Sequence, residues 1–120
     1  MSHPSFSALY LMELTQEVIP FWEKYSIDLE CGGYFTCIDG YNKVYDTDKF
    51  VWLQARQVWT FATLYDRLEK KDSWLKIALY GSDFLEKYGH DGDFNWYFSL
   101  QREGQPLIMP YNIFSHTFAC

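Results

Sequence analysis

The chain has 120 residues, enough for one small domain around one hydrophobic core. Hydrophobic residues make up 48% of the chain and aromatic residues 21%, which excludes a disordered protein. The net charge of −6 argues against a nucleic-acid partner, because phosphates require a basic surface.

Cysteine usage and apolar runs bear on the compartment. Cys31, Cys37 and Cys120 are odd in number and lack a CxxC spacing, so we predict neither a disulfide framework nor a zinc site. No basic leader followed by an apolar core opens the chain, and charged residues such as Arg56 interrupt the longest helical run. These features predict a cytoplasmic protein with reduced thiols and no membrane contact.

The first third of the chain predicts a helix followed by a hairpin. Apolar residues at helical spacing predict a helix over about residues 6–25, with Pro20 as a kink or restart. A β-hairpin is predicted next, over about residues 34–45. Tyr34, Thr36 and Ile38 alternate with Phe35 and Cys37, and Asp39–Gly40 is a typical turn pair.

Two further helices are predicted next. One covers about residues 48–70, with Asp46 or Thr47 as its N-cap. The other covers about residues 74–88 and is amphipathic. Its predicted inner side consists of Leu75, Ala78, Leu79, Leu85 and Tyr88.

The end of the chain repeats this layout. A second hairpin is predicted with its turn at Gly104, followed by the start of a fourth helix over 113–120. Tyr34–Phe35 corresponds to Tyr97–Phe98 at nearly the spacing that separates Phe50 from Phe114. Because helix-pair repeats stack on neighbours, we expect the chain to be the front of a longer protein.

The second predicted helix is apolar nearly all round, which predicts burial on most sides. The polar residues Gln54, Arg56 and Gln57 stand out against that background. Arg56 follows Trp52 by four residues and precedes Trp59 by three, so the three side chains share a face. We interpret Arg56 as either an ion-paired structural residue or the wall of a polar pocket, and Trp59 as core.

A specific resemblance covers nearly the whole chain. The stretch ECGGYFTCIDGYNKVYDTDKFVWLQARQVW, with FWEKYSID before it and PYNIFSHTFA after it, resembles the N-acylglucosamine 2-epimerase family. The resemblance implies an all-α fold, an (α/α)6 barrel or toroid with short β-hairpins between helix pairs. Residues 1–120 would then form the N-terminal portion of a single barrel domain, incomplete and roughly its first third.

The resemblance also implies an activity. The family is an isomerase family that interconverts N-acetyl-D-glucosamine and N-acetyl-D-mannosamine, by removing the C2 proton and returning it to the other face. Two histidines exchange this proton, a task that suits imidazole. Both would lie on later helices, so the chain should be inactive alone. No cofactor or metal is implied as a requirement, ATP enters as an activator, and the full-length protein is expected to form a homo-oligomer, a dimer.

Carried over to this sequence, the resemblance implies a role for several residues. Arg56 is the catalytic arginine that binds the open-chain oxygens and stabilises the developing charge, and Trp52 is a sugar-facing wall. Phe114 stands where some relatives have a pocket tyrosine, and Tyr34 and Ser115 are further substrate-binding candidates. The alternatives are core packing for Trp52 and support of the hairpin for Tyr34.

Two other functions stay open. The incomplete repeat would expose an apolar edge, which fits a non-catalytic helical module that binds a protein partner or self-associates. The other is a related sugar isomerase or a cellobiose 2-epimerase, which would differ from the N-acetylglucosamine epimerase only in its substrate.

Overall fold

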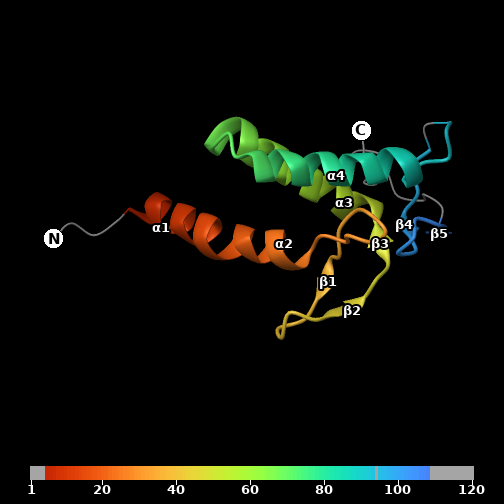
Figure 1. Cartoon of the computed structure of the whole chain (residues 1–120), viewed down its shortest axis with the longest axis horizontal. Coiled ribbons are helices and arrows are strands. Elements are labelled where there is room, and N and C mark those ends of the chain that lie inside the picture. The colour runs from red at the N-terminus through yellow and green to blue at the C-terminus, as the bar shows by residue number, and fades with distance from the viewer. Residues whose placement is uncertain (1–4, 94, 109–120) are drawn as a thin grey trace.

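The computed structural model describes residues 5–93 and 95–108, so the predicted fourth helix, including His116 and Cys120, lies outside the described residues. A long helical rod opens the fold, made of α1 (Phe6–Glu13), a π-helical turn η1 (Leu14–Val18) and α2 (Ile19–Tyr25) (Figure 1). Pro20 lies at the start of α2. The restart predicted at Pro20 thus coincides with the change from a π-helical turn to an α-helix at Ile19.

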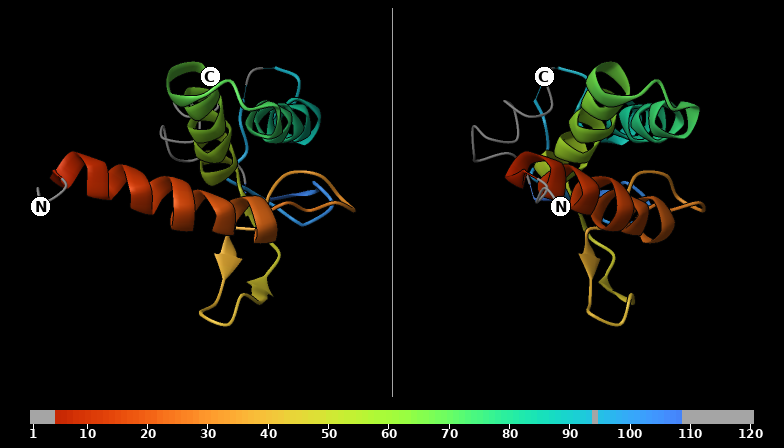
Figure 2. Two further views of the ribbon diagram at one scale, coloured as in Figure 1. Left: turned by 60° about the vertical axis from the view of Figure 1, so that its left-hand side comes forward. Right: turned by 90° about the vertical axis from the view of Figure 1, so that its left-hand side faces the viewer.

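The first hairpin pairs β1 (Cys37–Ile38) with β2 (Val44–Asp46) in antiparallel fashion. The predicted hairpin with its turn beginning at Asp39–Gly40 is confirmed, and the N–H of Asp39 donates to the carbonyl of Lys43 at 2.8 Å. Asn42 adopts a φ of 66°, a left-handed conformation that asparagine tolerates. Figure 2 shows the hairpin projecting away from the helices.

A second, three-stranded sheet joins distant parts of the chain. It is antiparallel with the order β3 (Lys49–Phe50), β4 (Ser99–Leu100) and β5 (Pro106–Ile108). The second hairpin and its turn are confirmed, and Gly104 has a φ of 99°, which favours glycine. The predicted helix start at residue 48 is wrong, because Lys49 and Phe50 pair with β4 instead.

Two helices follow and pack side by side. They are α3 (Val51–Thr63), extended by a π-helical turn η2 (Leu64–Leu68), and α4 (Asp72–Tyr88). Neither Asp46 nor Thr47, the predicted caps, is the N-cap of α3. Its N-cap is Phe50, which makes no side-chain hydrogen bond to the helix. The backbone partner of this helix end is the residue just before β4: the N–H of Val51 donates to the carbonyl of Phe98 at 3.1 Å.

The core forms two clusters along α3 and α4. One cluster joins the rod to the end of α3 and the start of α4. The other joins the start of α3 and the end of α4 to β4. Their members are Ile19, Phe61, Leu64, Trp74 and Ala78 in the first, and Val51, Ala55, Phe84, Leu85 and Leu100 in the second. On α4 the predicted inner residues Ala78 and Leu85 are buried, whereas Leu79 is 53% exposed and its prediction was wrong.

The described chain is therefore helix-rich with two small sheets. Within residues 5–93 and 95–108, no helix has the length and apolarity needed to cross a bilayer. The prediction that α3 is buried on most sides is wrong for the described residues, since Arg56 is exposed and Trp59 is 63% exposed. The reason is that the rod and α4 cover only part of its circumference, and Trp59 is not a core residue here.

Candidate active site on helix α3

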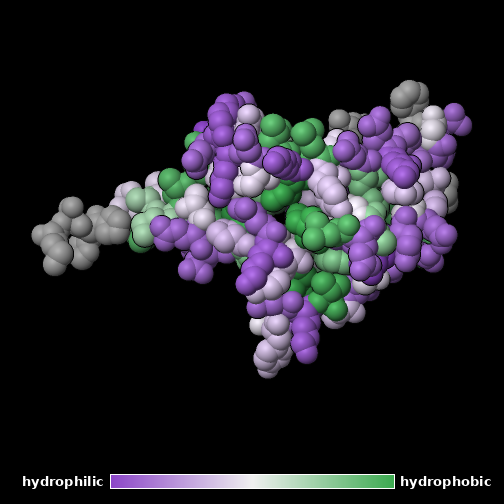
Figure 3. All heavy atoms as spheres, viewed as in Figure 1, coloured by the Kyte–Doolittle hydropathy of each residue, from purple (hydrophilic) through white to green (hydrophobic). Residues whose placement is uncertain are grey.

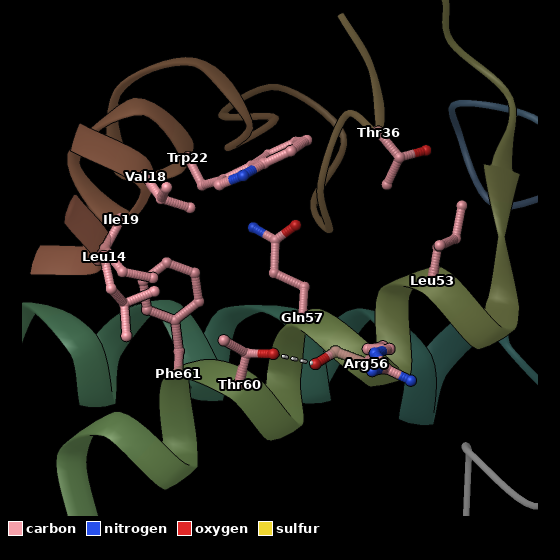
Figure 4. A pocket seen from close by; sticks show the side chains of 10 residues that line it. All are labelled: Leu14, Val18, Ile19, Trp22, Thr36, Leu53, Arg56, Gln57, Thr60 and Phe61. Atoms are coloured by element: carbon pink, nitrogen blue, oxygen red, sulfur yellow. Dashed lines mark hydrogen bonds between the residues drawn. The ribbon is translucent and has the colours of Figure 1, made fainter. Parts of the chain in front are cut away.

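A hollow of about 370 Å³ separates the helical rod from α3 (Figure 4). Its walls are mostly apolar, with a few polar groups from α3 and from the segment before β1. The lining residues are Leu14, Val18, Ile19, Trp22, Thr36, Leu53, Arg56, Gln57, Thr60 and Phe61. A concave, mainly apolar space with a few polar groups is the usual form of a small-molecule site.

Arg56, the predicted catalytic residue, lines this hollow. It lies on the second turn of α3 and is exposed, and its carbonyl accepts a hydrogen bond from the Thr60 hydroxyl at 2.9 Å. The structure therefore brings the predicted cation to the edge of a cavity and not into the core. Trp52, the predicted sugar-facing wall, lies one turn earlier and is partly buried. It is not among the residues that line the hollow, whereas its neighbour Leu53 is.

Gln57 and Trp22 are two of the lining residues that were not predicted as site residues. Gln57 points across the hollow toward Trp22 on the rod (Figure 4). Its amide nitrogen donates to the hydroxyl of Ser26 at 2.7 Å, which ties α3 to the end of α2. The signal for Gln57 was its polarity on an apolar helix, whereas Trp22 was indistinguishable in the sequence from an ordinary core residue.

Tyr34, predicted as a further ligand of the sugar, is completely buried. Its backbone N–H and C=O both bond to the side-chain amide of Gln54 at 2.8 Å, and its hydroxyl donates to the carbonyl of Ile77. Burial raises the pKa of the phenol above its usual value. These contacts hold the segment before the first hairpin against α3 and α4. The predicted ligands Phe114 and Ser115 lie outside the described residues.

A buried ionic network was missed entirely by sequence reasoning. The Asp28 carboxylate accepts hydrogen bonds from Lys49 Nζ at 2.8 Å and from Arg102 Nε at 3.0 Å and Nη2 at 3.1 Å. Asp28 and Lys49 are both fully buried. Burial would raise the pKa of Asp28, but the hydrogen bonds from Arg102 and Lys49 outweigh it and hold that pKa well below its usual range.

Replacing Asp28 with asparagine should reduce the loss of stability in acid. On acidification the unfolded carboxyl takes up its proton near its ordinary pKa, before the folded one does, so the unfolded state binds more protons. The stabilisation is therefore complete above about pH 5 and is lost as the pH falls toward the depressed folded pKa.

Urea unfolding between about pH 2.5 and 6 measures this effect. For the native protein Asp28 should contribute up to about 1.4 kcal/mol per pH unit below about pH 4, and this slope should be missing in Asp28→Asn. Asp83→Asn, on the exposed side of α4, gives the reference for removal of one carboxylate. Equal slopes in all three proteins would contradict the assignment.

A family model described as N-acylglucosamine 2-epimerase matches residues 33–120, which includes β3, α3 and Arg56. The chain belongs to the N-acylglucosamine 2-epimerase family. Among curated relatives, the mouse N-acylglucosamine 2-epimerase is 41% identical over 105 residues, which cover 84% of this chain and 25% of that protein. The cellobiose 2-epimerase of Bacteroides fragilis is 31% identical over 109 residues, which cover 89% of this chain and 28% of that protein.

Solved structures of sugar epimerases resemble this part of the epimerase family fold. A sugar epimerase from a ruminal bacterium matches with a TM-score of 0.86 and 27% identity, over 96% of this chain and 30% of that structure. The cellobiose 2-epimerase of Bacillus thermoamylovorans matches with a TM-score of 0.77 and 31% identity, over 86% of this chain and 26% of that structure. The chain thus spans about a quarter of the length of the curated relatives that it matches.

Proposed function

We propose that this chain forms the N-terminal portion of an (α/α)6-barrel isomerase that interconverts N-acetyl-D-glucosamine and N-acetyl-D-mannosamine. Family membership over residues 33–120 and the 41% identity to the mouse N-acylglucosamine 2-epimerase support this choice. The single observation that carries the site is the position of Arg56, exposed on α3 at the edge of a hollow.

The proposed reaction breaks the C2–H bond of the open-chain sugar. The proton goes to a base, and the electron pair shifts toward the C1 carbonyl, whose oxygen becomes negative in an enolate intermediate. The intermediate then collapses and C2 takes a proton on the opposite face. By family resemblance, the base and acid are histidines from the remainder of the full-length protein.

Arg56 has the chemistry that the intermediate requires. A guanidinium is always charged and presents several donors in a planar fork, so it can bind two neighbouring sugar oxygens together. Charge appears on the C1 oxygen only during the reaction, so a fixed cation beside it lowers the barrier. By family resemblance Trp52 would add an aromatic wall beside the residues that line the hollow, and Gln57 would add a hydrogen-bonding amide.

Proton exchange with solvent tests the proposal. The full-length protein, meaning a protein of the relatives' length that carries this chain, should convert N-acetyl-D-glucosamine in D₂O to N-acetyl-D-mannosamine with deuterium at C2. Cellobiose and mannose, offered in parallel, test the related epimerase and isomerase reactions. Conversion of cellobiose alone would move the substrate assignment to the cellobiose branch of the relatives, and retention of the C2 proton would contradict the mechanism.

A second candidate is a helical binding or self-association module without catalysis. The observation that favours it is the exposed apolar surface of the described residues, including Phe6 at 79% and Trp59 at 63% exposure. Figure 3 shows apolar side chains breaking the polar surface where the rod meets α3 and α4. Absence of turnover on all three sugars by the full-length protein would favour this candidate. We further propose, by family resemblance, that the full-length epimerase is activated by ATP, forms a dimer and is located in the cytoplasm.

A further inference from the structure

The buried network of Asp28, Lys49 and Arg102 joins three segments that lie far apart in the sequence. Asp28 belongs to the loop after α2, Lys49 to β3, and Arg102 to the turn between β4 and β5. These segments gather at the end of the helices where α3 begins (Figure 1). We propose that the network positions Arg56 for the epimerase reaction, an inference that rests on the proposed function.

Lys49 is the centre of the argument because every donor of its ammonium group is used. Nζ donates to Asp28 Oδ2 at 2.8 Å, to the Gly32 carbonyl at 2.6 Å and to the Arg102 carbonyl at 2.9 Å. Lys49 is fully buried, and a buried ammonium is tolerated only with such partners. The position of Nζ is therefore determined by three different backbone and side-chain groups.

The Asp28 carboxylate is equally well satisfied. Besides the two cations, Oδ1 accepts from the backbone N–H groups of Glu30 and Cys31 at 3.1 Å each. Arg102 also donates to Glu30 Oε2 at 3.1 Å, at the exposed edge of the network. Because the guanidinium binds Asp28 through both Nε and Nη2, the angle between the two loops is defined as well as their distance.

The connection from the network to Arg56 is short and stiff. Lys49 pairs with Leu100 in the sheet, and Val51, the first residue of α3, donates its N–H to the Phe98 carbonyl. From Val51 onward the chain is a continuous helix to Thr63, with Arg56 on its second turn. A shift or tilt of the start of α3 therefore moves the Arg56 guanidinium relative to a bound sugar.

The rings of Phe84 and Phe35 face Lys49 Nζ in cation–π contacts, with centroids 4.8 and 5.6 Å away. The alternative to placement by the network is that apolar packing around such rings keeps the loops folded. Apolar contacts are non-directional and allow small sliding movements, whereas a fully bonded ionic network allows only one arrangement. The network is thus suited to precise placement of a neighbouring functional group. Lys49→Met separates these two contributions, because it keeps the length and apolar stem and removes the donors.

The test is a double-substitution cycle in the full-length protein, with deuterium exchange at C2 of N-acetyl-D-glucosamine as the assay. Lys49→Met alone should lower kcat on the order of tenfold, with a smaller change in KM, because misplacement of a catalytic group mainly affects the reaction step. In the Arg56→Ala background the same change should lower kcat less than about twofold. Equal effects in both backgrounds would overturn the proposal, because a merely structural role gives additive losses.

Trp74→Phe provides the matched control. Trp74 is buried at the other end of α4 and donates to Glu23 at 2.9 Å, so its loss weakens the fold away from the network. Its effect on kcat should be small and the same with or without Arg56. Should Lys49→Met fail to fold, Arg102→Gln replaces it, because Arg102 is 30% exposed and its removal leaves the Lys49–Asp28 pair in place.

A second measurement does not depend on turnover. In Lys49→Met, hydrogen exchange of the hydrogen-bonded amides at the start of α3, Val51 and residues 55–57, should accelerate about tenfold or more, while those at the start of α4 should keep their rates. In Trp74→Phe the pattern should be reversed. If the native protein is inactive and the variants show this exchange pattern, the proposed function is wrong and the anchoring of α3 stands. Unchanged exchange of these α3 amides in Lys49→Met would contradict the anchoring.

Discussion

Replacing Arg56 with alanine should lower kcat/KM for N-acetyl-D-glucosamine by about 10²-fold in the full-length protein, a loss of about 2.7 kcal/mol of transition-state stabilisation. The physical reason is that the guanidinium would face the C1 oxygen, which becomes negative only after the C2 proton has left. The loss should therefore fall mainly on kcat.

Two further variants separate this role from general effects of charge. Arg56→Lys keeps the charge but loses the planar fork, so it should recover only part of the activity. Arg67→Ala removes an exposed arginine from η2, at the far end of the same helical segment, and should leave kcat/KM within about twofold. Near-native epimerisation by Arg56→Ala would remove this residue from the mechanism.

Gly81→Ala should strongly destabilise the fold. Gly81 lies on α4 directly against the ring and hydroxyl of Tyr34, so a Cβ at this position would overlap with the phenol far inside van der Waals contact. Tyr34 is 0% exposed and its backbone is bonded to Gln54, so it has no room to move. We expect the free energy of unfolding to fall by about 3 kcal/mol, although alanine is the better helix former by about 1 kcal/mol.

Denaturant unfolding of the full-length protein measures this cost, with Gly40→Ala as the matched control. A Cβ on Gly40 meets nothing within 4 Å, so that variant should lie within about 0.5 kcal/mol of the native protein. In a Tyr34→Ala background the clash is absent, and Gly81→Ala should then cost almost nothing. An equal cost with and without the tyrosine ring would show that crowding is not the cause.

Local patterns in the sequence predicted most of the elements and the cation of the candidate site. The hairpin around Asp39 and the helices on either side of residues 70–72 depend on alternation, helical spacing and turn residues, all of which act between near neighbours in the chain. Arg56 was recognisable because a charged residue interrupted an apolar helix and because the surrounding string resembled a family. Those signals do not need the fold to be known.

The contacts that the sequence could not predict are those between distant segments. Lys49 and Phe50 look like the first turn of a helix, and they become a strand because Ser99 and Leu100 offer backbone partners. Asp28, Lys49 and Arg102 look like ordinary surface charges at three unrelated positions. A charge is buried only where partners from other segments replace its water, so the three-dimensional arrangement alone decides which charges are buried. The sequence alone thus determined the helix periodicity, the turns and the family. Only the tertiary packing determined that the network beside α3 is buried and that Arg56 is exposed.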